Sequence, residues 1–197
     1  MISRHFTKGG KFAKRGFDDR GFTLVELMVV SAIIIILSVY VSANYHQGNR
    51  ELALEMTVGK LAQDLRRAQE WGYSGHQFGG ISYTGYGIHI VDNGTFYELY
   101  TDNSGDGRYT AAFTDEVRET INFDNDFEVD TLKPCGPTES CTAISSMSVN
   151  YVPPDPGTVI TDSTGTQYDE ATIILKIEGT ATTRSVVVNR AGLIYVK

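Results

Sequence analysis

The chain is poor in the residues that most often build catalytic and metal sites. Its 197 residues include two cysteines, four histidines and one tryptophan. The histidines have no zinc-ligand spacing, and neither a Gly-x-Ser-x-Gly nucleophile elbow nor a glycine-rich phosphate loop is present. There is also no internal repeat. The sequence therefore does not predict an enzyme.

Positive charge is also scarce. The chain has 17 Lys and Arg against 24 Asp and Glu. Residues 92–130 alone hold eleven acidic side chains and only two basic ones, Arg108 and Arg118. Binding to a phosphate backbone needs clustered lysines and arginines that release counterions. We therefore do not expect nucleic acid as a partner.

The most informative segment is a long apolar run near the N-terminus. From Phe22 to Ala43 there are 22 residues with one charge, Glu26, and no proline. At a rise of about 1.5 Å per residue, a helix of this length reaches about 33 Å, enough for the roughly 30 Å hydrocarbon core of a bilayer. The run predicts a membrane-spanning helix.

The residues before this run determine its orientation. Met1 to Gly21 contains six basic and two acidic residues, so its net charge of +4 predicts a cytoplasmic N-terminus. The plausible cleavage site, Gly21, comes before the apolar run, whereas a secretory signal peptide is cut after it. Removal of this leader keeps the helix and changes the net charge from −7 to −11.

The run Arg20-Gly21-Phe22-Thr23-Leu24-Val25-Glu26 resembles the leader of type IV prepilins, the precursors of type IV pilins, minor pilins and type II secretion pseudopilins. The resemblance implies that prepilin peptidase cuts after Gly21 and methylates the new amine of Phe22. It also implies that Glu26 pairs with this amine on a neighbouring subunit, because an acid in a membrane helix needs a partner. The alternative is an ordinary signal anchor with Glu26 at the membrane interface.

Beyond the membrane run, the pattern predicts an α+β, type IV pilin-like fold, in which a long N-terminal helix packs on an antiparallel β-sheet head. An apolar stripe with spacings of four and three residues indicates that the helix continues to about Trp71 and packs on the head. Gly72, Gly75 and the Gly79-Gly80 pair are expected to end it. The predicted parts are a leader (1–21), a transmembrane or filament-core helix (22–43), an amphipathic helix (44–72) and a β-rich head (73–197). The stripe consists of Leu54, Val58, Leu61, Leu65 and Ala68.

Residues 73–197 contain several segments rich in β-branched and aromatic residues, separated by turn residues. Asp92-Asn93-Gly94-Thr95 is a strong hairpin signal, and Asn189-Arg190-Ala191-Gly192 is expected to join the last two strands. Strand order is not predicted. The expected strands are 85–91, 95–100, 120–129, 147–152, 171–177 and 184–188.

The two cysteines, Cys135 and Cys141, fall on the outer side of the predicted membrane, where disulfides form. We expect them to pair, which would contribute about 2 kcal/mol by closing a short loop. A metal site is disfavoured because no histidine lies nearby, and a redox dithiol more often has two intervening residues.

One acidic loop leaves two interpretations open. Asp102, Ser104 and Asp106 place oxygens at alternate positions and Arg108 could add a backbone carbonyl, as in the first half of a calcium loop. Phe113 stands where such a loop needs a bidentate glutamate. The other interpretation is a polar hairpin tip that uses Asp-Gly turn chemistry. No cofactor other than this calcium ion is suggested.

The resemblance implies a structural subunit of a type IV pilus-like filament, with other pilin subunits, prepilin peptidase, an inner-membrane assembly platform and the membrane as partners. Many major pilins have a glycine and a proline where this chain has Ile35 and Ala43, which favours a minor pilin or a pseudopilin over the main building block. The helix segment 61–69 and the closing hairpin resemble GspH/FimT-type minor pilins. The alternatives are a type II secretion pseudopilin and a pilus-tip adhesin. Expected locations are the cell membrane before assembly, then an extracellular pilus or periplasmic pseudopilus.

Overall fold

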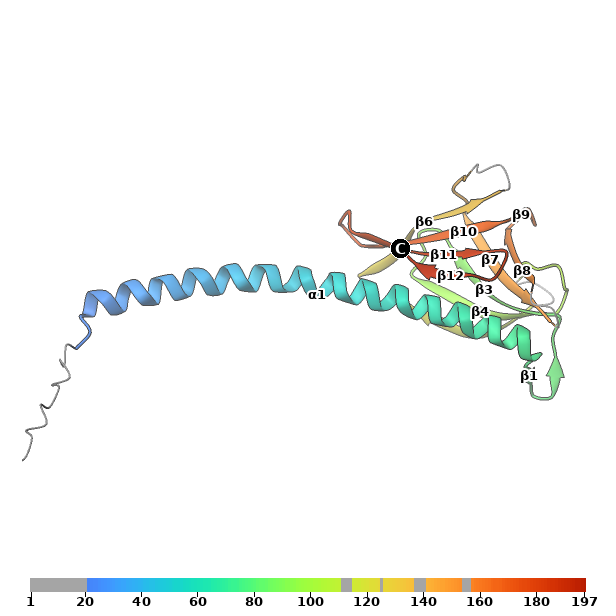
Figure 1. Cartoon of the computed structure of the whole chain (residues 1–197), viewed down its shortest axis with the longest axis horizontal. Helices are drawn as coiled ribbons and strands as arrows, with labels where there is room; N and C mark the ends of the chain where they lie inside the picture. Colours follow the sequence, from blue (N-terminus) through green and yellow to red (C-terminus); the bar gives the residue numbers. More distant parts are fainter. Residues whose placement is uncertain (1–20, 111–114, 125, 137–140, 154–156) are drawn as a thin grey trace, which may run out of the picture. The chain divides into compact units, whose positions relative to one another are not determined.

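The computed structural model describes residues 21–110, 115–124, 126–136, 141–153 and 157–197, with only the backbone for 43–47. The chain divides into two compact units, one ending at Asn44 and the other comprising Tyr45–Lys197. Figure 1 shows the elements coloured along the chain. The leader up to Arg20 lies outside the described residues, as do residues 154–156 of the segment Pro153-Pro154-Asp155-Pro156, whose three prolines predict a rigid loop or a sheet-edge device.

The first element is one helix, α1 (Leu24–Ser74), of 51 residues. We expected it to begin at Phe22, but Thr23 precedes it as the N-cap residue. We also expected Gly72 to help end it, and this was wrong, since Gly72 lies inside the helix. The helix ends one residue before Gly75, which adopts a positive φ of 56° that favours glycine.

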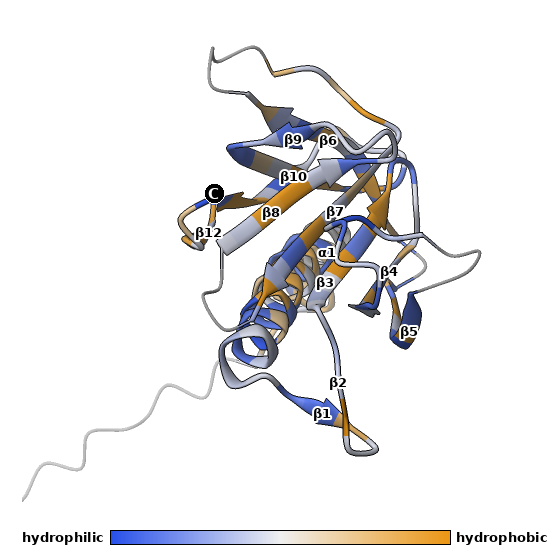
Figure 2. Cartoon of the chain, turned by 90° about the vertical axis from the view of Figure 1, so that its right-hand side faces the viewer, coloured by the Kyte–Doolittle hydropathy of each residue, from blue (hydrophilic) through white to orange (hydrophobic). Residues whose placement is uncertain are grey.

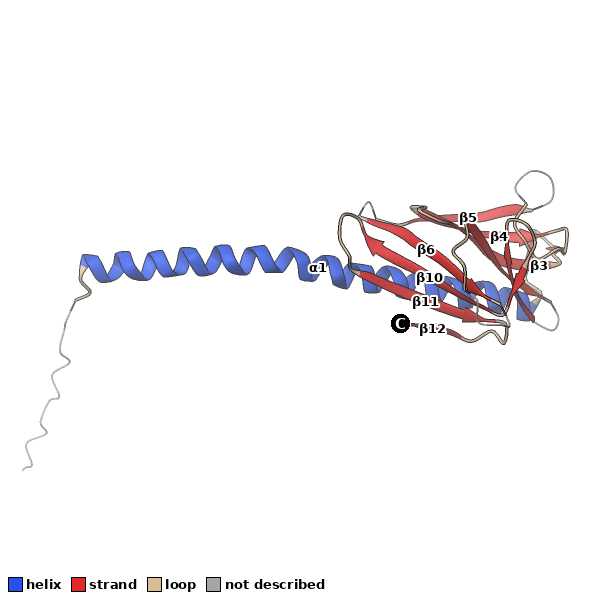
Figure 3. Cartoon of the chain, turned by 90° about the horizontal axis from the view of Figure 1, so that it is seen from above, coloured by secondary structure: helices blue, strands red, loops and turns tan. Residues whose placement is uncertain are grey.

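The strands form a six-stranded sheet, a four-stranded sheet and a two-stranded hairpin, all antiparallel. The six-stranded order is β5-β4-β3-β7-β8-β9, and the four-stranded order is β12-β11-β10-β6. Figure 3 shows β6, β10, β11 and β12 side by side. The strands are β1 (Gln77–Phe78), β2 (Ile81–Ser82), β3 (Gly85–Val91), β4 (Phe96–Asp102), β5 (Glu116–Asn122), β6 (Phe127–Cys135), β7 (Ser146–Val152), β8 (Gly157–Asp162), β9 (Gln167–Tyr168), β10 (Glu170–Ile177), β11 (Thr183–Asn189) and β12 (Ile194–Val196).

The α+β fold and its antiparallel pairing are confirmed. The turn at Asn93 joins β3 to β4, and Asn93 itself has a φ of 56°, as a tight hairpin turn requires. The single strand expected over 120–129 was wrong. The chain leaves one sheet at Asn122 and enters the other at Phe127, because the backbone N–H of Phe127 bonds the carbonyl of Asp124 in a turn between them.

The C-terminal unit is built on the predicted apolar stripe of α1. All five stripe residues have 0% exposed surface, and they share one core with residues of both large sheets. Figure 2 shows this part of α1 beside β3 and β7, with the apolar residues in orange. Residues that alternate along β3 and β4, including Ile88, Ile90 and Leu99, supply the sheet side of this core. The stripe prediction is therefore confirmed.

Gly72 does not end the helix but allows it to pack closely against the sheet. A Cβ atom added at Gly72 would lie 2.8 Å from the Cβ atom of Tyr151 on β7, closer than side-chain atoms approach. The last turn of α1 therefore lies against the β7 backbone, and only a residue without a side chain fits there.

Candidate functional site

The N-terminal end of α1 carries a reciprocal hydrogen-bonded cap. The Thr23 hydroxyl accepts a 3.2 Å hydrogen bond from the backbone N–H of Glu26. In return, the Glu26 carboxylate accepts 3.4 and 3.5 Å bonds from the N–H and hydroxyl of Thr23. This is a capping box, in which Thr is the N-cap and Glu the third helical residue. Sequence reasoning missed Thr23, although its spacing of three from Glu26 is the recognised signal.

The geometry leaves the Glu26 carboxylate available. Its two bonds to Thr23 are at the long end of the hydrogen-bond range, and the side chain is exposed. A carboxylate offers about four acceptor positions, so further donors can bind it. It also lies in the first turn of the helix, where the macrodipole favours negative charge. Phe22, four residues earlier in the chain, is 80% exposed.

The apolar part of α1 has the length and composition to cross a membrane. Leu24–Ser42 is the one such span among the described residues, and none of its side chains is buried within the protein. Two of its serine hydroxyls are satisfied locally, since Ser31 Oγ donates to the carbonyl of Met28 at 2.9 Å and Ser38 Oγ to that of Ile34 at 2.7 Å. The segment therefore presents a mostly apolar surface to lipid or to other helices.

In the C-terminal unit, polar contacts fix α1 to the sheets. Asp64 is buried on α1, and its Oδ2 atom accepts a 2.5 Å hydrogen bond from the Tyr97 hydroxyl on β4. Arg67 pairs with the same carboxylate at 3.5 Å and with Glu119 on β5 at 2.5 Å. Near the start of this unit, Arg50 Nε lies 3.2 Å from an oxygen of Asp126. These contacts were not predicted from the sequence.

The acidic loop after β4 is organised around Asp102, which is fully buried. One carboxylate oxygen accepts bonds from the Ser104 hydroxyl (3.0 Å) and the Gly105 N–H (2.6 Å). The other accepts bonds from the Gly107 N–H (2.9 Å) and the side-chain amide of Asn150 (2.7 Å). The carboxylate therefore stabilises the loop through four donors.

Asp106, another predicted ligand of this loop, does not share the contacts of Asp102. Asp106 binds Arg108, with a 2.7 Å bond from the guanidinium Nε atom. Among the described residues, no group of three or more His, Cys, Asp or Glu side chains is arranged to hold a metal ion. Calcium binding by Asp102, Ser104, Asp106 and the Arg108 carbonyl stays a prediction.

A second polar group lies near this loop on the same sheet. His89 Nδ1 is 3.2 Å from the Ser148 hydroxyl on β7, and the imidazole lies 4.5 Å from the Tyr109 ring between centroids. Burial lowers the pKa of His89 from its usual 6.5 to about 4, because the charged form loses hydration. The imidazole is therefore neutral at pH 7.

The predicted disulfide is present. Cys135 and Cys141 are bonded, with Cα atoms 4.2 Å apart. Cys135 ends β6, and its carbonyl accepts the backbone N–H of Asp169 at 3.0 Å. The bond therefore closes a loop directly after a strand of the four-stranded sheet.

Comparison with known proteins gives one match. The family model for the prokaryotic N-terminal methylation motif matches residues 15–42, which contain Gly21, Phe22 and Glu26. No curated protein and no solved structure matches the chain. The motif is typical of structural proteins that assemble with other pilin subunits and with the membrane. The match and the exposed apolar helix that begins within it support a type IV pilin-like prepilin.

Proposed function

We propose that the chain is a minor pilin of a type IV pilus-like filament. The observation that carries this proposal is the apolar start of α1, exposed along its whole length and bearing one carboxylate, Glu26, within the matched motif. A prepilin peptidase removes residues 1–21 and methylates Phe22. An inner-membrane platform then moves the subunit from the membrane into the filament, outside the cytoplasmic membrane.

Assembly replaces lipid contacts of the helix with contacts to other helices. Hydrophobic burial gives little net gain in that exchange, so association depends on close packing and on polar pairs. Glu26 supplies one half of a polar pair. Its exposed carboxylate can form an ion pair with the positively charged amine of Phe22 on a neighbouring subunit. In the low-dielectric filament core this pair fixes the axial position of each subunit. The small residues that permit close packing are Ser31, Ala32, Ser38 and Ser42.

A minor pilin is favoured over the main building block by the continuity of α1. The helix has no break at Ile35 or Ala43, where many major pilins carry glycine and proline. A subunit without such helix breakers is less able to extend locally when the fibre is stretched. A type II secretion pseudopilin of the GspH type would share this feature, and subcellular location separates the two. Epitope-tagged protein at intervals along surface fibres supports the minor pilin, and tagged protein confined to the periplasm contradicts it.

The central test uses Glu26 and Thr23. The capping box needs the hydrogen-bonding groups of both residues, whereas the intersubunit pair needs only the charge of Glu26. Glu26→Gln keeps a residue that can close the capping box but removes the charge. Thr23→Ala removes the cap but keeps the charge. We expect Glu26→Gln to reduce incorporation into filaments at least tenfold and Thr23→Ala to reduce it much less, with both variants inserted and cleaved.

The measurement combines mass spectrometry of the N-terminus with quantitative immunoblotting of sheared filaments. Wild-type protein is expected to begin with methylated Phe22. A mature chain that begins elsewhere contradicts processing after Gly21. Normal incorporation of Glu26→Gln contradicts the ion pair, and equal loss in both variants means that the cap, not the charge, is what assembly needs.

A further inference from the structure

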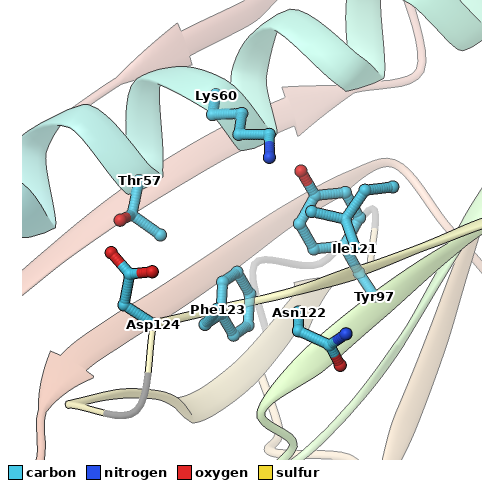
Figure 4. A pocket seen from close by; sticks show the side chains of 7 residues that line it. All are labelled: Thr57, Lys60, Tyr97, Ile121, Asn122, Phe123 and Asp124. Carbon is cyan, nitrogen blue, oxygen red and sulfur yellow. The ribbon is translucent and has the colours of Figure 1, made fainter.

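The head carries a small pocket that the assembly function does not use. It lies between the part of α1 that packs on the head and the end of β5, and it has a volume of about 90 Å³. Such a volume has room for a ligand of a few heavy atoms. Figure 4 shows the lining residues, which are Thr57, Lys60, Tyr97, Ile121, Asn122, Phe123 and Asp124.

Two opposite charges face this pocket without pairing. Lys60 is exposed on α1, and within the described part of the chain no carboxylate forms an ion pair with it. Asp124 is exposed after β5, and its backbone carbonyl, not its carboxylate, accepts the N–H of Phe127. Figure 4 places the Lys60 ammonium and the Asp124 carboxylate on different sides of the pocket.

The neighbouring charged side chains, in contrast, form ion pairs. Arg67 binds Asp64 and Glu119, and Arg50 binds Asp126. Lys60 and Asp124 therefore take no part in the ion pairs that join α1 to the sheets of the head. Convergent polar groups around a partly apolar pocket are the usual signature of a small-molecule site.

The remaining walls are mostly apolar or already satisfied. Phe123 is 7% exposed, and Figure 4 shows its ring on the wall of the pocket opposite α1. The Tyr97 hydroxyl is held by Asp64, so Tyr97 contributes its ring. The Thr57 hydroxyl donates to the Ala53 carbonyl at 2.8 Å and keeps its lone pairs for an outside donor.

We propose that this pocket binds a small zwitterion of the α-amino acid class. The ligand carboxylate binds Lys60, its ammonium group binds Asp124 and the Thr57 hydroxyl, and a short apolar side chain packs on Phe123. A ligand with a single charge would leave either Lys60 or Asp124 without a partner. The charge pattern therefore selects the zwitterion over a simple anion or a simple amine.

The test is ligand-observed NMR on the full mature chain in nanodiscs, with L-alanine as the probe. Propanoate lacks the ammonium group of alanine, and ethylamine lacks its carboxylate. We expect saturable binding of L-alanine with a dissociation constant of about 1 mM, as for a ligand of few heavy atoms. Propanoate and ethylamine are expected to bind at least tenfold more weakly.

Variants assign the site. Lys60→Met and Asp124→Asn are each expected to weaken L-alanine binding at least tenfold, and both side chains are exposed, so the fold should tolerate the changes. Lys133→Met and Glu55→Gln likewise remove one positive and one negative charge, but outside the pocket, and they should leave L-alanine binding unchanged. The proposal fails if no saturable binding is found, if propanoate binds as well as alanine, or if the pocket variants reduce filament incorporation while alanine does not bind.

Discussion

The Tyr97 hydroxyl on β4 donates a hydrogen bond to the carboxylate of Asp64 on α1, and Asp64 is only 7% exposed. The apolar stripe around it is non-directional and would tolerate a small slide of the helix along the sheet. A hydrogen bond to a buried charge is directional and short, so it favours one position. Asp64 and Tyr97 therefore set the register of α1 on the head.

Tyr97→Phe is expected to lower the free energy of unfolding by about 1–2 kcal/mol, because it leaves the buried Asp64 with one donor fewer. Asp64→Leu with Tyr97→Phe removes both partners, and its loss should be smaller than the sum of the two single losses. Chemical denaturation in detergent, followed by the fluorescence of Trp71, measures this. Purely additive losses would show that the two residues do not interact energetically.

The sequence predicted what depends on local pattern. The stripe on α1, the turn at Asn93 and most strands follow from spacing and turn chemistry, because each involves residues close together in the chain. Glu26 stood out as the one charge in an apolar run. The structure confirms the stripe, the turn and most of the strands, whereas the assembly role of Glu26 stays a prediction.

What the sequence did not predict depends on contacts between distant residues. From the sequence, Gly72 was expected to end the helix, because no residue near it in the chain indicates that Tyr151 packs against it. The buried contact of Asp102 with Asn150 was not predicted, since Asn150 comes from a strand 48 residues later. The division into two sheets likewise depends on which strands pair. Thr23 is different, since its capping signal was present in the sequence and was overlooked.

Gly72→Ala tests the close packing of α1 on β7. Alanine has a better helix propensity than glycine by about 1 kcal/mol, but its Cβ atom would meet that of Tyr151 at 2.8 Å. We expect a net destabilisation of about 1–3 kcal/mol from overpacking. Gly59→Ala is the matched control, because Gly59 is also helical and a Cβ atom there meets nothing within 4 Å. It should stabilise the protein, and a stabilising Gly72→Ala would contradict the packing role.

Asp102→Asn tests whether the carboxylate organises the loop after β4. The substitution replaces one acceptor oxygen with an NH₂ group that faces existing donors, so at least one buried donor loses its partner. We expect a loss of about 2–3 kcal/mol in the free energy of unfolding. Asp106→Asn, which breaks a partly exposed pair with Arg108, should cost less than about 1 kcal/mol. Similar losses for the two variants would assign no special role to Asp102.

His89 should make stability depend on pH in a defined window. Its pKa is about 4 in the folded protein and about 6.5 when unfolded, so below pH 6.5 the unfolded chain binds a proton that the folded chain does not. The contribution of His89 is therefore fully present above pH 6.5 and is lost as the pH falls toward 4, by at most about 1.4 kcal/mol per pH unit.

His89→Gln, which does not titrate, should flatten this slope between pH 6.5 and 5, where most carboxylates contribute little. The measurement is the free energy of unfolding by denaturant at several pH values, followed by circular dichroism. His76→Gln serves as the control, because His76 is exposed after α1 and away from Ser148 and Tyr109. An unchanged slope in His89→Gln would show that the buried imidazole takes up its proton without opening the fold.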